Sequence, residues 1–196
     1  MSPVSLFVYT LFLIAVTMLV VWFAQNKKQI KAPIKHLALG AVLMSALGPL
    51  GEIFVGTFYN YVAGFPLWQY QIFPVHHGYT SLYAPVIWAV GGIELCLLDA
   101  YLRGKMISRV WRHALLAVDI LAVELAINIG LFVTFGHMIF RYTPGDLLHF
   151  SSLQTLPFYF IAGLVFTGAF KILKPNSYLA AALFGFITFV VVFLAN

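Results

Sequence analysis

Long apolar runs dominate this chain and leave few folds open to it. Six of them are about as long as a helix needs to be to cross a bilayer, roughly 20 residues; they cover residues 3–24, 36–60, 81–102, 113–138, 157–173 and 177–195. Of the 196 residues, 62% are hydrophobic and 9% are charged, which excludes a soluble domain. The sequence therefore predicts an all-α integral membrane protein, a bundle of six transmembrane helices that forms a single domain over residues 1–196.

Basic residues predict the orientation of this bundle. Ten of the eleven Lys and Arg residues follow the first, third and fifth predicted helices, at Lys27, Lys28, Lys31, Lys35, Arg103, Lys105, Arg109, Arg112, Lys171 and Lys174. By the positive-inside rule these loops face the cytoplasm, so both termini are expected on the outer side of a bacterial-type plasma membrane or an equivalent one. The same asymmetry accounts for the net charge of +5, so no nucleic-acid partner is expected.

Three further features limit the organisation of the chain. The first apolar run has no basic residues ahead of it and no small-residue cleavage site, so we expect a retained helix rather than a signal peptide. Cys96 is the only cysteine, which excludes an intrachain disulfide. No internal repeat is evident from the residues alone.

Five of the six acidic residues fall inside predicted spanning segments. A carboxylate near the bilayer centre costs ~3 kcal/mol on insertion scales, so these acids should face a protein interior or a wet cavity. Asp99 and Asp119 come at the inner end of the bundle, close to Arg103, Arg109 and Arg112. We expect these two acids to pair with basic side chains.

The remaining buried acids, Glu52, Glu94 and Glu124, have no basic partner on their own helices and are candidate catalytic residues. Helical rise places Glu52 ~24 Å above the inner end of its helix and Glu124 near the middle of the bilayer. Asn128 follows Glu124 by four residues on the same helix face, so it joins the candidate catalytic set. Glycines beside Glu52 and Glu94 predict close helix packing or a cavity, and Pro49 predicts a kink.

The two longer outer loops, residues 61–80 and 139–156, are rich in aromatic residues and histidine and poor in charge. We expect them to lie in the membrane interface, as an aromatic belt or as a lid over a cavity. His76 and His77 are candidate catalytic residues at the mouth of that cavity. The candidate substrate-binding residues are Trp68, Tyr79, Trp88, His137, Asp146 and His149.

Two other chemistries fit part of these loops. The outer histidines and Asp146 offer metal ligands, but no HxxxH or HExxH pair is present, so no metal is assigned. Asp146, His149 and Ser151 or Ser152 could form a Ser-His-Asp hydrolase, although a GxSxG elbow is absent. Asp146 is also a natural helix N-cap.

Three classes of function follow from these residues. The favoured one is a cofactor-independent enzyme that uses buried carboxylates for acid-base chemistry on a lipid or isoprenoid, as an isomerase or cyclase. Its design is similar in architecture and chemistry to small membrane-bound terpene cyclases and sterol isomerases. The alternatives are a proton-coupled transporter or channel and an accessory subunit of a membrane complex. The expected partners are a hydrophobic substrate and membrane lipids, and a homo-oligomer is left open.

Overall fold

The computed structural model describes residues 3–26, 30 and 32–173, together with positions 185, 188 and 190. It is mostly helical (75%), and its described part contains five helices long and apolar enough to cross a membrane. They are α1 (Pro3–Asn26), α2 (Ile34–Ala63), α3 (Ala84–Gly104), α4 (Arg109–Phe135) and α5 (Leu156–Ile172). The first five predicted helices are confirmed, and the helix predicted over 177–195 falls outside the described residues except at three positions.

Helix boundaries differ from the predicted ones where turn chemistry sets them. α4 ends at Phe135 rather than at 138, because Gly136 adopts a left-handed backbone (φ 69°) that closes the helix. α3 begins at Ala84 rather than at 81, because residues 80 and 81 belong to a strand. Pro85 then occupies the first turn, where no intrahelical N–H is needed. α2 runs through Pro49 as one helix, without the local opening suggested by the sequence.

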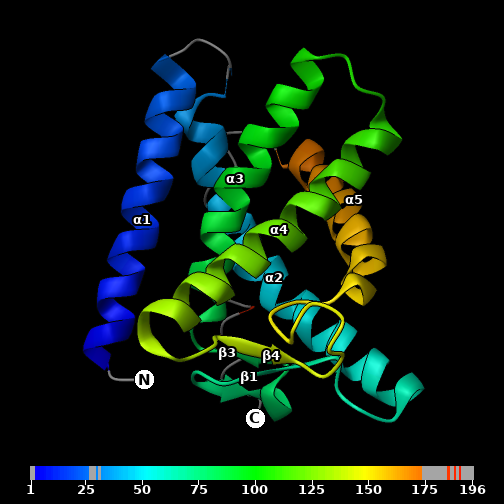
Figure 1. Cartoon of the computed structure of the whole chain (residues 1–196). Coiled ribbons are helices and arrows are strands. Elements are labelled where there is room, and N and C mark those ends of the chain that lie inside the picture. The colour runs from blue at the N-terminus through cyan, green and yellow to red at the C-terminus, as the bar shows by residue number, and fades with distance from the viewer. Residues whose placement is uncertain are drawn as a thin grey trace.

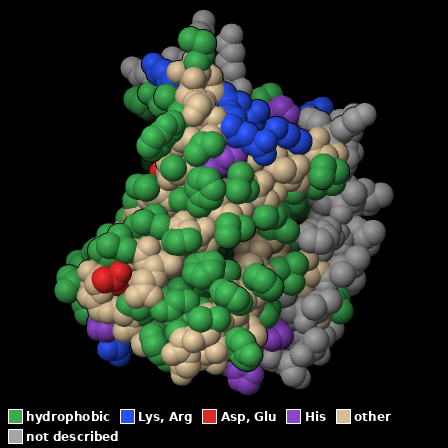
Figure 2. All heavy atoms as spheres, turned by 90° about the vertical axis from the view of Figure 1, so that its right-hand side faces the viewer, with side chains coloured by type: hydrophobic (Ala, Val, Ile, Leu, Met, Phe, Trp, Pro, Cys, Tyr) green, Lys and Arg blue, Asp and Glu red, His purple; other side chains and the backbone are tan. Residues whose placement is uncertain are grey.

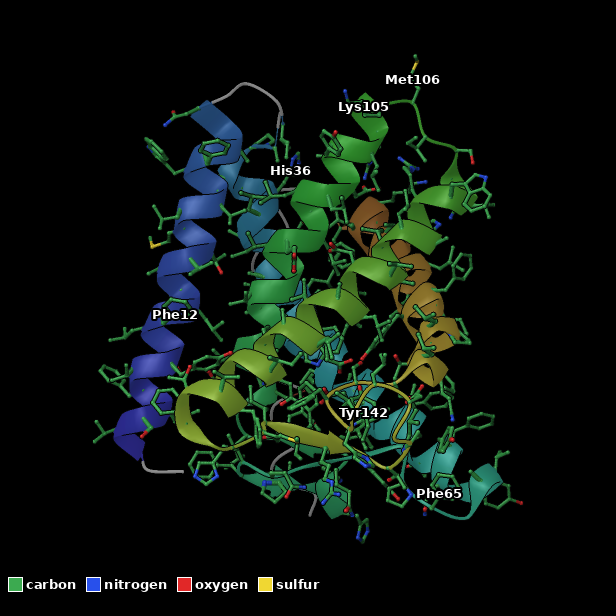
Figure 3. All side chains as sticks on the ribbon, viewed as in Figure 1. Phe12, His36, Phe65, Lys105, Met106 and Tyr142 are labelled. Atoms are coloured by element: carbon green, nitrogen blue, oxygen red, sulfur yellow. The ribbon has the colours of Figure 1, made fainter. Side chains whose placement is uncertain are left out.

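The helices alternate in direction, so the helix bundle has two distinct ends (Figure 1). Lys105 and Met106, in the link between α3 and α4, lie at one end, and Tyr142 and Phe65 lie near the other (Figure 3). Viewed from the α5 side, Lys and Arg side chains gather at the first end, and hydrophobic side chains cover most of the surface beyond them (Figure 2). This separation of charge from apolar surface suits a multi-pass membrane protein.

The second end is closed by short strands that the all-α prediction did not include. β1 (Trp68–Tyr70) pairs antiparallel with β4 (Phe140–Tyr142), and β2 (Pro74–Val75) pairs with β3 (Thr80–Ser81). Two 3-10 helices, η1 (His76–Gly78) and η2 (Leu153–Thr155), complete this layer. We call residues 64–83 and 136–155 the roof. Pairing satisfies backbone groups of these segments where they are removed from water.

Small residues bring α2 and α3 into close contact, as predicted. A Cβ atom on Gly92 would lie 2.3 Å from the backbone oxygen of Gly40. A Cβ atom on Gly48 would lie 2.1 Å from the ring of Trp88, so this glycine leaves the space that the indole fills. The glycines therefore set both the spacing of the two helices and the position of Trp88.

The helix pairs α2–α3 and α4–α5 correspond to each other at a constant separation of 72 residues. α2 and α4 both end at a glycine in the left-handed region, with φ 78° and 69°, and α3 and α5 both carry a proline in their first turn. Seven matched positions keep the same residue: 43 and 115 (Leu), 52 and 124 (Glu), 64 and 136 (Gly), 70 and 142 (Tyr), 77 and 149 (His), 85 and 157 (Pro), and 91 and 163 (Gly).

The strand register obeys the same correspondence. Trp68 pairs with Tyr142 and Tyr70 pairs with Phe140, on either side of the central Gln69–Arg141 pair. Replacing each residue by its counterpart 72 positions away turns the Trp68–Tyr142 pair into the Phe140–Tyr70 pair. A two-fold axis through the central pair requires this exchange. Parallel repeats related by an axis along the membrane normal have this form. The structure thus reveals a repeat that the sequence reading missed.

Candidate active site

A cavity of about 580 Å³ lies directly under the roof. Its wall combines residues of α2 and α5 with Trp88 of α3, Glu124 of α4 and side chains of β1 and β4. This volume lies within the range of small-molecule sites, ~300–1,000 Å³. Among the described lining residues, the only ionisable groups besides tyrosines are the carboxyls of Glu52 and Glu124. The cavity is therefore a largely apolar chamber with two carboxyl groups in its wall.

The Glu52 carboxyl accepts hydrogen bonds from three different segments. Its Oε1 accepts from the Tyr70 hydroxyl and from Trp88 Nε1 at 2.9 Å. Its Oε2 accepts from Thr80 Oγ1 at 2.5 Å. The side chain is buried, and no Lys, Arg or His of the described residues forms an ion pair with it. Its polarity is balanced by these three donors alone.

The Glu124 carboxyl is held in a matching way. Its Oε1 accepts from the Tyr142 hydroxyl at 2.5 Å, and its Oε2 accepts from Ser151 Oγ at 2.6 Å. The Tyr142 hydroxyl also lies 3.2 Å from the Tyr159 hydroxyl. Each glutamate thus bonds the tyrosine 18 residues later in the chain, on a roof strand.

The two carboxyls differ in the chemistry of their partners. An indole N–H can only donate, so Glu52 Oε1 must present a lone pair to Trp88. The described partners of Glu124 are hydroxyls, which either donate or accept. The hydroxyl network around Glu124 can therefore reverse to hold a protonated carboxyl, whereas the indole fixes Glu52 Oε1 as an acceptor.

The roof tyrosines act as hydrogen-bond donors at neutral pH. Burial, with the adjacent Glu52, holds the pKa of Tyr70 well above its ordinary value. Burial and the adjacent Glu124 do the same to the pKa of Tyr142. Both phenols therefore keep their protons in the hydrogen bonds to the carboxyls.

Glu94 lies next to the two cavity glutamates. Its side chain, on α3, lines a smaller cavity of about 50 Å³, whose wall also contains Glu52, Glu124 and Tyr159. A water molecule needs only about 10–15 Å³ of such volume. The three candidate catalytic acids predicted from the sequence thus share one small cavity.

Asn128 has a different position from the one expected of a catalytic group. Its Nδ2 donates to the carbonyls of Phe140 and Phe150, at 2.7 and 2.9 Å, and its Oδ1 accepts from the amide of Ile139 at 2.9 Å. The side chain is fully buried. Because its donors and acceptor are taken up by roof backbone, Asn128 is a positioning residue that holds the segments next to Tyr142 and Ser151.

The inner acids agree only in part with the predicted pairing. Asp99 forms an ion pair with Arg103 and lies 3.7 Å from Arg112. Asp119 forms no ion pair within the described part of the chain, and its Oδ2 is buried there without a hydrogen-bond partner. Among the described residues Asp119 therefore lacks the predicted basic partner, since Arg103 and Arg112 both lie against Asp99.

The predicted aromatic residues divide between the cavity and the roof. Trp68 and Trp88 line the cavity. Trp68 also donates its Nε1 to the Tyr79 carbonyl at 2.8 Å. Tyr79 is buried against Gly56, where a Cβ atom would lie 2.6 Å from the phenol ring, so this tyrosine packs the roof onto α2.

The histidines are not brought to the cavity. His76 and His77 form η1, both with positive φ (51° and 59°), and neither is among the described lining residues. His137 and His149 line a separate outer pocket of about 300 Å³ together with Arg141. These four histidines therefore lie at the same end of the bundle as the cavity, but they do not line it.

The hydrolase and metal alternatives find no assembled site here. Asp146 accepts from the Leu153 amide at 2.8 Å and from Ser152 Oγ, so it caps the start of η2. His149 Nδ1 bonds the Tyr142 carbonyl, while Ser151 donates to Glu124. These contacts do not link serine, histidine and aspartate. Within the described ranges, no group of three or more His, Cys, Asp or Glu side chains could hold a metal ion.

Sequence reasoning missed the hydroxyl partners of the glutamates as functional residues. They are Tyr70, Thr80, Tyr142 and Tyr159, while Ser151 was considered only as a hydrolase nucleophile. A signal for two of them was present, because each of the two glutamates is followed 18 residues later by a tyrosine.

Comparison with known proteins gives no match. No protein-family model, no curated protein and no solved structure matches the chain. The function must therefore be argued from the site itself.

Proposed function

We propose that this chain is a membrane-embedded enzyme that moves protons on an uncharged unsaturated lipid, as an isomerase or cyclase of isoprenoid type. The observation that supports it is the pair of glutamates in one apolar cavity, each held by hydrogen bonds from the roof. Two carboxyls in unlike surroundings are a common arrangement for an acid and a base. An accessory subunit has no need of such a chamber.

Glu124 is the acid and Glu52 the base in this proposal. The Glu124 carboxyl gives its proton to one carbon of a double bond and becomes a carboxylate, leaving a cation on the neighbouring carbon. Aromatic faces of the wall, Trp88 and Phe140 among them, stabilise that cation. The Glu52 carboxylate then removes a proton from an adjacent carbon, and the C–H electron pair forms the new double bond. Atoms and charge balance without a cofactor.

After each turnover the proton has to return from Glu52 to Glu124. The cavity of about 50 Å³ that both carboxyls share with Glu94 provides the route. A water molecule in this space, together with the Glu94 carboxyl, carries the proton back. Glu94 is therefore a proton-transfer residue of the site rather than a group that touches the substrate.

The proposal includes a membrane arrangement. All of residues 1–196 form one domain of six spanning helices, the sixth over 177–195, with both termini on the outer side of a bacterial-type plasma membrane or its equivalent. The basic residues between α3 and α4 support the cytoplasmic assignment of that end. The roof and the cavity then belong to the outer half of the bilayer.

Lipid mass spectrometry on membranes of a host that expresses the chain tests the reaction. We expect the wild type to change one isoprenoid or other neutral lipid. Glu52→Gln and Glu124→Gln, at equal abundance, lower that product by about 10²–10⁴-fold, the usual contribution of a general acid or base. Asp146→Asn, an acid outside the cavity, is the matched control and leaves the product unchanged. Product at wild-type level in both glutamine variants would contradict the proposal.

Infrared difference spectroscopy tests the two roles separately. The C=O stretching band of a protonated carboxyl is expected in the purified wild type and in Glu52→Gln, and it disappears in Glu124→Gln. The reason is that the described partners of Glu124 are hydroxyls, while Glu52 faces the donor-only indole. A band that is lost in Glu52→Gln and kept in Glu124→Gln would reverse the assignment.

Proton-coupled transport is the second candidate function. It is favoured by the continuity of acids from the cavity through Glu94, and by Asp119, whose buried Oδ2 has no partner among the described residues. Liposomes loaded with a pH-sensitive dye decide between the two. Proton flux in the wild type that Glu94→Gln stops, with lipids unchanged in several hosts, would favour transport over catalysis.

A further inference from the structure

Within the described part of the chain, the cavity is open on its side rather than at its top. Phe54 and Phe58 on α2 and Ile161 and Val165 on α5 line it, and their exposed fractions are 72, 50, 55 and 51%. Residues that both line a cavity and reach the surface mark its opening. All four are apolar; Phe54, Phe58 and Ile161 lie in the half of their helices nearest the roof, and Val165 lies just past the midpoint of α5. The opening therefore faces the region that lipid tails occupy.

The roof closes the path to water. Leu67, Trp68, Tyr70, Phe140 and Tyr142 are each at most 8% exposed, so the layer above the cavity is sealed. Its two segments are fastened to each other by the β1–β4 pairing and by a hydrogen bond of 2.9 Å from the Thr143 amide to the Leu67 carbonyl.

Further bonds tie the roof to itself and to the helices below. Trp68 Nε1 bonds the Tyr79 carbonyl, and the Asn128 side chain bonds three backbone groups. A roof held in this way is a fixed cover, not a lid that has to lift. The water-side mouth expected near the histidines is replaced by a lateral one.

The geometry points to an uncharged lipid that enters sideways, between α2 and α5, from the outer leaflet of the membrane. This inference rests on the proposed function for the requirement that the lipid be unsaturated. The outer leaflet follows from the proposed membrane orientation, and the uncharged headgroup follows from the wall. Among the described residues lining the cavity there is no Lys, Arg or His, so an anionic headgroup would lack a counter-ion there. The Glu52 and Glu124 oxygens already accept protein donors, so a strongly polar headgroup gains few new partners.

Gly51 offers a way to block the opening. It lies on the exposed side of α2 among the residues that line the cavity, and no described atom lies within 4 Å of a Cβ placed on it. Gly51→Leu therefore adds a side chain at the opening whose Cβ meets no described atom, and replacing a helical glycine favours the helix. Gly168→Leu is the matched control, because Gly168 on α5 has equally open surroundings among the described residues but is not part of the cavity wall.

Tryptophan fluorescence reports entry without any assay of turnover. Trp22 and Trp111 are 62 and 68% exposed and are first replaced by Phe, which leaves Trp68 and Trp88 in the cavity wall. In liposomes, a brominated long-chain alkane dissolved in the bilayer is expected to quench the remaining fluorescence strongly, and aqueous iodide only weakly. Gly51→Leu lowers the alkane quenching at least several-fold, and Gly168→Leu leaves it unchanged.

Each outcome bears on the entry route separately from the chemistry. Iodide quenching as strong as that of the alkane, or alkane quenching insensitive to Gly51→Leu, would overturn lateral entry. A brominated phospholipid that quenches as well as the neutral alkane would overturn the exclusion of charged headgroups. Quenching as expected, with no lipid product in the expression experiment, keeps the entry route and removes the proposed reaction.

Discussion

Asn128→Leu loosens the roof and lowers stability by about 3 kcal/mol or more. The substitution leaves two carbonyls and one amide of the roof without their side-chain partner, at positions 139, 140 and 150. A buried backbone group that loses its partner costs about 1–3 kcal/mol. Tyr142 and Ser151 follow Phe140 and Phe150 by two residues and one residue, so their bonds to Glu124 weaken as well.

Hydrogen exchange followed by mass spectrometry measures this effect. We expect faster exchange across residues 136–152 in Asn128→Leu, including the Ile139 amide, and unchanged exchange in the first turns of α4. Gln71→Leu is the control: this exposed roof amide bonds the nearby Gln69 carbonyl and leaves the Asn128 bonds untouched. Wild-type protection of residues 136–152 in Asn128→Leu would show that other contacts hold the roof.

Gly92→Ala is expected to destabilise the protein strongly, although it adds only one methyl group. The new Cβ would lie 2.3 Å from the Gly40 backbone oxygen and 2.9 Å from Met44 Cβ. A backbone atom cannot rotate away, so α2 and α3 have to separate. Overpacking of this kind costs about 1–3 kcal/mol, which corresponds to a fall in the melting temperature of roughly 5–10 °C.

The neighbouring glycine makes a matched control for this substitution. A Cβ on Gly91 would lie 4.0 Å from its nearest described neighbour, a Trp88 ring carbon, which is ordinary van der Waals contact. Thermal unfolding of both variants in the same detergent should show a loss for Gly92→Ala and little change for Gly91→Ala. Equal melting temperatures would mean that the two helices can adjust their spacing freely.

The helices could be predicted because the bilayer dictates their length and composition. The roof could not, because β1 and β4 are three residues each and their register is set by a partner 72 residues away rather than by local propensity. Residues in such short strands have no periodic pattern long enough to detect. The repeat was not detected from the sequence for a related reason. Helix ends and turns need particular residues, but at most apolar positions one hydrophobic residue can replace another.

The acids of the site were predicted from the sequence, but most of their hydrogen-bond partners were not. Glu52 and Glu124 stood out because an acid in a spanning helix needs a physical reason. Asn128 was placed on the correct face, yet its role depends on backbone groups that no sequence pattern reveals. His76 and His77 were grouped with the cavity by depth alone, and depth does not tell whether a side chain points toward the cavity or away from it.

The correspondence at 72 residues has a consequence for how such a site could arise. A single helical hairpin carrying one glutamate, one tyrosine and one strand would bring two copies of these groups together as a symmetric dimer, because the strand pairs with its own copy across the two-fold axis. In that dimer the two carboxyls are identical, and neither can specialise. Joining the copies in one chain lets each half diverge. The Trp88 indole now bonds Glu52, and the Tyr159 hydroxyl now lies beside Tyr142 on the Glu124 side. These two side chains make the surroundings of the two glutamates different.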